Sequence, residues 1–106
     1  MTFVSLADLA EREPFPGYAG RFLHGTGMSV AHWTVRAGSG FPEHRHPHEQ
    51  IAMVVEGRFE MTVAGETRVL EPGTVAVIPS NVPHSGRALT ACRLVDVFQP
   101  VREDYR

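Results

Sequence analysis

The chain has 106 residues, of which 42% are hydrophobic and 21% charged, and its formal net charge is −2. A chain of this length fits one domain with one hydrophobic core, and a small net charge of mixed sign gives no electrostatic basis for binding nucleic acid or an anionic membrane surface. All ten basic residues are arginines, which excludes chemistry at a lysine amine.

Cysteine usage and the N-terminal segment bear on the compartment. Cys92 is the only cysteine, so an internal disulfide and a thiolate metal cluster are both excluded. The N-terminal segment lacks the basic and apolar regions of a secretion signal. No apolar run approaches the roughly 20 residues that span a bilayer. We therefore expect a cytoplasmic protein.

The expected elements are short, and nearly all of them are strands. Residues 5–13 could form a short helix, because Ser5 is a suitable N-cap and Pro14 ends the pattern. Further on, alternating or β-branched runs are separated by Gly and Pro. The predicted strands cover residues 20–24, 28–36, 50–56, 58–64, 66–70, 74–78, 84–87 and 92–99. Strands this short and closely spaced predict an all-β, antiparallel sandwich or barrel.

One domain accounts for the whole chain, residues 1–106. The barrel should occupy about residues 20–99, with an N-terminal extension over residues 1–19. Apolar residues two apart, such as Trp33 and Val35 or Phe59 and Met61, should face the core. A barrel this small has sheet edges to cover. We therefore expect a homodimer in which the extension lies against the partner's sheet edge.

Four side chains, distant in sequence, predict one metal site. His44 and His46 are two apart and face the same side of an extended chain, and Gln50 has the same parity. His84, which follows the proline-stiffened residues 79–83, is the candidate fourth ligand. Imidazole ligands suit a divalent Zn, Ni, Fe or Mn ion. His48 shares the parity but precedes the strand, so we expect it in the substrate pocket rather than on the metal.

These residues resemble the two sequence motifs of the cupin family. The places of the first motif are held by Gly38, His44, His46, Gln50 and Gly57, with Gln where the family has Glu. The places of the second are held by Gly73, Pro79 and His84, with Asn81 in place of a Gly and Ala88 in place of the final Asn. Asn tolerates the left-handed conformation that a turn glycine supplies. The resemblance implies a double-stranded β-helix, or jelly-roll barrel, that binds a metal.

Within the cupins, the segments 46–50, 78–84 and 96–105 look like the small pectin-degradation cupins. That family converts 4,5-unsaturated uronates, which are sugar acids, to linear keto-uronates. The resemblance implies three His and a Gln as metal ligands. It also implies that Asp96, Phe98 and Arg102 lie in the substrate pocket.

A neutral ligand set leaves the metal its full +2 charge, which favours non-redox Lewis-acid chemistry over oxygen activation. Asp96 would then act as general acid or base, Phe98 as an apolar wall, and Arg102 as a clamp for a substrate carboxylate. Arg58 and Arg87 are further candidates for the same clamp. Three functions stay open: an enzyme that opens the ring of an unsaturated uronate, a non-catalytic cupin that binds a small anion or sugar, and a metal-dependent dioxygenase.

Overall fold

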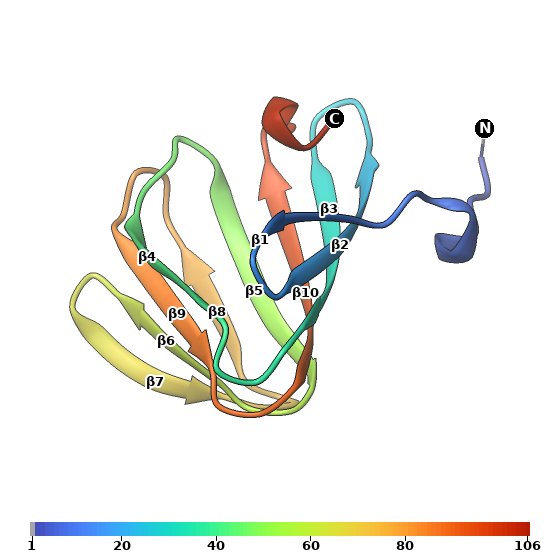
Figure 1. Ribbon diagram of the computed structural model, residues 1–106. Helices are drawn as coiled ribbons and strands as arrows, with labels where there is room; N and C mark the ends of the chain where they lie inside the picture. The colour runs from blue at the N-terminus through green and yellow to red at the C-terminus, as the bar shows by residue number, and fades with distance from the viewer. Residues whose placement is uncertain (1) are drawn as a thin grey trace.

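The computed structural model describes residues 2–106 (Figure 1). Ten strands form within this range: β1 (Arg12–Phe15), β2 (Tyr18–His24), β3 (Ser29–Val35), β4 (Gly40–His44), β5 (Glu49–Glu56), β6 (Phe59–Val63), β7 (Glu66–Leu70), β8 (Val75–Ile78), β9 (His84–Ala88) and β10 (Cys92–Gln99). Two single helical turns, η1 (Leu6–Asp8) and η2 (Glu103–Tyr105), lie near the ends of the chain.

The strands form two antiparallel sheets that face each other (Figure 1). One sheet has six strands in the order β1-β2-β3-β10-β5-β8, and the other has four in the order β4-β9-β6-β7. Consecutive strands alternate between the sheets through much of the chain, as in a jelly roll. The prediction of an antiparallel jelly-roll barrel is confirmed.

The core lies between the two sheets and follows the predicted alternation. Trp33 and Val35 from the larger sheet and Phe59 and Met61 from the smaller one are all buried. Burying a side chain as large as Phe59 stabilises the fold by about 2 kcal/mol. This packing holds the two sheets together below the end of the barrel at which the histidines lie.

The prediction of a helix over residues 5–13 is wrong. Only the turn η1 forms there, Ser5 makes no capping hydrogen bond, and Leu6 stays exposed. A helix of so few residues needs an apolar face packed on the rest of the protein, and this one has none. None of the helical turns in the described range is long and apolar enough to cross a membrane.

Part of the predicted N-terminal extension belongs to the larger sheet. Strand β1 pairs with β2 of the same chain, so the sheet begins at Arg12 rather than near residue 20. The rest of the extension stands off the barrel (Figure 1), and its first residue lies outside the described range.

Strand β4 was not predicted from the sequence, because its Gly40 and Pro42 are typical of a loop. It is an edge strand and pairs only with β9 in the smaller sheet. A proline is tolerated at such an edge, where one side of the strand needs no backbone donor. The unexpected strand matters for function because it ends at His44.

Candidate metal centre

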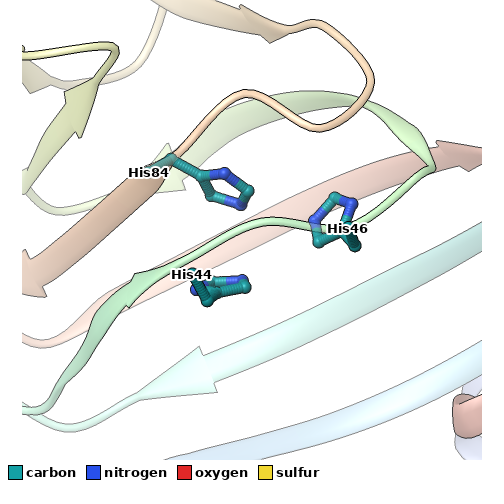
Figure 2. Close-up of side chains that lie close together, drawn as sticks. All are labelled: His44, His46 and His84. Atoms are coloured by element: carbon teal, nitrogen blue, oxygen red, sulfur yellow. The ribbon is translucent and has the colours of Figure 1, made fainter.

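Three of the four predicted ligands converge at one end of the barrel (Figure 2). His44 ends β4, His46 follows in the loop to β5, and His84 begins β9. One ring nitrogen from each lies within 4.8 Å of the other two. The ring centroid of His84 is 4.4 Å from that of His44 and 4.9 Å from that of His46. These separations suit three imidazoles around one ion.

Backbone contacts hold the three rings in place. His44 and His84 are direct partners across the β4–β9 pair. The loop before His84 is tied to the loop that carries His46, since the Asn81 backbone N–H donates to the His46 carbonyl at 2.8 Å. Asn81 has φ of 62°, the left-handed conformation that its place in the cupin motif predicts. The Ser80 hydroxyl adds a second tie by donating to the Pro47 carbonyl at 2.6 Å.

Hydrogen bonds select the same tautomer for all three histidines. In each ring Nδ1 lies near a backbone carbonyl oxygen two residues away, at 3.2 Å for His44, 3.0 Å for His46 and 2.9 Å for His84. A carbonyl only accepts, so Nδ1 carries the hydrogen and Nε2 presents a lone pair. The Nε2 atom of His84 is buried and has no hydrogen-bond partner among the described residues. A cation at this point would satisfy it, so the donor set fits a metal ion.

Gln50 completes the set from β5. Its Oε1 lies 3.1 Å from Nε2 of His46. The Gln50 side chain also lies beside the Asp96 carboxylate and lowers its pKa. An amide N–H directed at that carboxylate would leave the amide oxygen pointing at the histidine. Two acceptors at this distance repel each other unless a cation lies beside both. This contact therefore supports Gln50 as the fourth ligand.

Burial keeps the imidazoles in the form that binds a metal. Burial, followed by the positive charge of Arg102, lowers the pKa of His46 to about 4. Burial also lowers the pKa of His84 from its usual value. Both rings are therefore neutral at pH 7, and no proton has to leave them before a cation binds.

The lowered pKa values predict acid sensitivity of the metal-free protein. His46 has a pKa of about 4 in the folded chain and about 6.5 when unfolded, so the unfolded state binds more protons between these values. The free energy of unfolding should therefore have its full value above pH ~6.5 and fall by about 2 kcal/mol as the pH drops from there toward 4. Urea denaturation of chelator-treated protein at a series of pH values measures this. A H46Q variant should lose less, and an unchanged slope in that variant would contradict the assignment.

The four candidate ligands line a cavity of about 450 Å³. Its walls are mainly aromatic and its polar groups cluster near the histidines. Of the residues predicted for ligation, catalysis or the pocket, the lining includes His44, His46, Gln50, His84, Asp96, Phe98 and Arg102. The sequence analysis did not predict the other members, which are Phe15, Tyr18, Trp33, Phe41, Pro42, Asp104 and Tyr105. Trp33 could have been predicted in the cavity wall, because the alternation along its strand turns its side chain inward.

Asp96 is the carboxylate of the cavity wall. The Trp33 Nε1–H donates to its Oδ2 at 3.0 Å. Burial raises the pKa of Asp96 to about 6, although hydrogen bonds from Gln50 and Trp33 and the charge of Arg102 act in the opposite direction. A carboxyl group with this pKa exchanges a proton readily near neutral pH. It also touches Gln50, so it is coupled to the ligand set.

Arg102 lies in the cavity wall but already has a carboxylate partner. Its guanidinium lies over the rings of Phe98 and Tyr105, at 4.7 Å and 4.4 Å from their centroids. Its Nε and Nη2 donate to the two oxygens of Asp104 at 3.0 Å and 2.7 Å. The position predicted for Arg102 is thus compatible with a clamp, and the structure adds an internal anion that the sequence analysis missed.

Three of the predicted pocket residues, Arg58, Arg87 and His48, do not line the cavity. Arg58 is exposed and lies 3.8 Å from Glu71, and Arg87 is exposed on β9. Each directly precedes a buried residue, Phe59 and Ala88, so alternation turns both arginines outward. The structure therefore does not support a substrate contact for either.

His48 lies beside the site rather than in it. Its ring centroid is 5.5 Å from that of His46 and 6.4 Å from that of Phe98. The His48 backbone carbonyl accepts from Nδ1 of His46, which fixes the orientation of that ring. His48 does not line the cavity, so its expected place in the substrate pocket is not supported. Its backbone rather than its imidazole makes the contact to the ligand set.

The fold and the histidine cluster define a cupin. Residues 31–98 match the family described as Cupin domain, and the chain belongs to that family. The chain is 33% identical over 79 residues to the pectin degradation protein KdgF of Dickeya dadantii (strain 3937). The aligned region covers 74% of this chain and 72% of the relative.

Two solved structures extend this similarity. KdgF from a Halomonas species superposes with a TM-score of 0.93 at 28% identity, over 100% of this chain and 99% of the other. An RmlC-like cupin from Shewanella frigidimarina NCIMB 400 superposes with a TM-score of 0.94 at 27% identity, over 100% of this chain and 96% of the other. The chain is therefore similar to a pectin degradation protein in both sequence and fold.

Proposed function

We propose that this chain is a metal-dependent enzyme that opens the ring of a 4,5-unsaturated uronate to give a linear keto-uronate. The observation that carries the proposal is the position of Asp96, a carboxyl group with a pKa of about 6, in the same cavity as the three-histidine cluster and Arg102. The similarity to KdgF supports pectin-derived sugar acids as the substrate class.

The reaction is an isomerisation and needs only proton transfers. The proton of the hydroxyl on C1 is removed, the bond from C1 to the ring oxygen breaks, and a proton is added at C4, so that the enol becomes a ketone. Asp96 accepts the first proton and can return one. A divalent cation held by the three imidazoles and Gln50 would supply Lewis-acid stabilisation of developing negative charge on a substrate oxygen.

The other cavity residues bind and orient the substrate. The guanidinium of Arg102 has N–H groups besides the two that Asp104 occupies, and these can donate to the substrate carboxylate. Phe98 and the other aromatic walls exclude water and pack on the sugar ring. Trp33 holds Asp96 by its hydrogen bond.

Ultraviolet spectroscopy tests the proposal, because ring opening removes the conjugated C4–C5 double bond. Protein reconstituted with Mn, Fe(II), Ni or Zn should speed the loss of the unsaturated uronate band well beyond the spontaneous rate. No acceleration with any of the four metals would contradict the proposal. Ligand-induced melting shifts without product would then indicate a binding cupin. Oxygen uptake with Fe(II) would indicate a dioxygenase.

Asp104 should weaken the binding of an anionic substrate. D104N removes a negative charge next to Arg102, whose orientation the flanking rings of Phe98 and Tyr105 maintain. One such charge at about 4 Å in water is worth about 1 kcal/mol, so KM should fall about fivefold with kcat unchanged. Steady-state kinetics on the uronate measure this.

Glu103 provides the matched control for D104N. It pairs with Arg106 at 2.7 Å on the exposed surface, so E103Q removes the same charge one residue away. KM should not change in that variant. A rise of KM in D104N would show that Asp104 orients Arg102 instead of competing with the substrate.

A further inference from the structure

The hydroxyl of Tyr18 is a buried polar group in the cavity wall that the packing of the chain does not use. Tyr18 begins β2, and only 3% of the residue is exposed. Its hydroxyl makes no hydrogen bond with any of residues 2–106. A buried hydroxyl without a partner destabilises the fold, and a phenylalanine would fill the same space without that cost. The packing therefore gives no reason for a hydroxyl at this position.

Aromatic neighbours hold the Tyr18 ring in one orientation. It meets Trp33, Phe41 and Phe15 edge to face, with the ring centroids 5.7, 6.1 and 6.2 Å apart. A ring packed against three others has little freedom to turn toward another partner. Tyr18 thus has the rigid support that a residue needs in order to position a ligand.

Tyr18 lines not only the cavity but also a smaller hollow that lies deeper between the sheets. The hollow has a volume of about 20 Å³, which is room for about one small polar group such as a hydroxyl. Tyr18, Gln50 and Asp96 are the polar residues among those that line it, and all three line the cavity as well. The hollow therefore continues the cavity inward and brings a small group to the Asp96 carboxylate.

The strand register leaves space beside that carboxylate. Asp96 pairs with Ala31 of β3 on one side and with Ala52 of β5 on the other. Both neighbours are buried and carry only a methyl group. A carboxylate accepts up to about four hydrogen bonds, so the bond from Trp33 leaves capacity for a ligand.

Tyr18 and Asp96 are complementary toward a hydroxyl group. Burial, followed by the negative charge of Asp96, raises the pKa of Tyr18 above its usual value, so its hydroxyl keeps its proton and can donate. Asp96 can accept. A hydroxyl donates one hydrogen bond and accepts others, so one sugar hydroxyl can bind both residues at once.

We propose that Tyr18 is a substrate-contacting residue, whose hydroxyl donates a hydrogen bond to the C1 oxygen of the sugar acid while the hydrogen on that oxygen points to Asp96. This assignment rests on the proposed function, in which Asp96 removes that hydrogen as a proton. Tyr18 itself neither gains nor loses a proton. Its hydrogen bond stabilises the negative charge that develops on the C1 oxygen as the proton leaves. With the carboxylate at Arg102, the substrate is held on both sides of the ring oxygen.

Y18F tests the proposal in the full-length, metal-loaded protein, because it removes the hydroxyl alone. The value of kcat/KM for the unsaturated uronate should fall at least tenfold. Resistance to urea should not fall, since no hydrogen bond of the free protein is lost. T62V is the matched control: the Thr62 hydroxyl lies 2.7 Å from that of Thr67, and neither residue lines the cavity. It should leave kcat/KM unchanged.

Calorimetry with galacturonate separates the contact from the reaction. Galacturonate has the C1 hydroxyl and the carboxylate but no C4–C5 double bond, so this reaction cannot consume it. Its dissociation constant should rise about two- to tenfold in Y18F, the range for one neutral hydrogen bond. The 1,5-anhydro analogue, which lacks the C1 hydroxyl, should bind the wild type and Y18F equally.

Each outcome decides the proposal. Wild-type kcat/KM and galacturonate affinity in Y18F would overturn it, as would an equal loss in T62V. Equal weakening of galacturonate and its anhydro analogue by Y18F would overturn the contact to the C1 oxygen. Galacturonate binding that depends on Tyr18, in a protein that turns over no unsaturated uronate, would support the contact while the proposed function fails. A wild type that neither binds galacturonate nor turns over the uronate would overturn both.

Discussion

Replacing Asp96 with asparagine should lower kcat for an unsaturated uronate at least a hundredfold, the usual contribution of a positioned general base. An asparagine side chain fills the same space and can still accept from Trp33, but it takes up no proton near pH 6. No hydrogen bond within residues 2–106 links the Asp96 side chain to any of the three imidazoles. Metal content should therefore remain at the wild-type level. Kinetics and metal analysis of one preparation measure both quantities.

The control for D96N is E49Q, the same chemical change at an exposed carboxylate. Glu49 begins β5 and is exposed, so kcat should not change. Turnover retained in D96N would place the base elsewhere. Loss of metal together with turnover would instead show that Asp96 acts through Gln50, by fixing the orientation of the amide.

The contact between Asp96 and Gln50 gives a physical reason for the departure from the family's glutamate. A glutamate at position 50 would place a second carboxylate against Asp96, and one of the two would have to take a proton. The neutral amide adds no second negative charge, lowers the pKa of Asp96 and places its oxygen 3.1 Å from Nε2 of His46. In the proposed mechanism, metal ligation and proton transfer would thereby be separated between two side chains.

Residue parity and family spacing were sufficient to predict most of the metal centre. His44 and His46 share a parity, and the structure brings both to His84. The same rule placed Asp96 and Phe98 on the inner face of β10, where both line the cavity. These predictions hold because side chains alternate strictly along a strand and because both motifs lie at strand ends.

The alternation of side chains along a strand could not predict contacts that depend on a turn or on a strand at a sheet edge. Arg102 and Asp104 lie beyond β10, where no strand period applies, so their pairing could not be predicted. Arg58 and Arg87 were chosen by charge, although alternation turns both outward. Strand β4 contains the glycine and proline of a loop, and only its pairing with β9 makes it a strand.

Removing one imidazole should abolish stable metal binding. H84A deletes the buried Nε2 that has no hydrogen-bond partner among residues 2–106. Loss of a residue that merely supports a ligand weakens metal affinity roughly 10–100-fold, and loss of a ligand should exceed this. Elemental analysis after dialysis should find about one divalent ion per chain in the wild type and almost none in H84A. The wild type should also gain about 2.7 kcal/mol of stability when the free metal is at 100 times its dissociation constant.

The matched control for H84A is H48A, in which the neighbouring histidine outside the cluster is removed. The His48 backbone carbonyl still accepts from His46 in this variant, because the substitution leaves the main chain intact. H48A should therefore keep the metal and its stabilisation. H46A provides a second ligand deletion at a less buried position, in case H84A does not fold. A folded H84A or H46A that keeps a tightly bound ion, or an H48A that loses it, would show that the ion is held by groups other than the three converging imidazoles and Gln50.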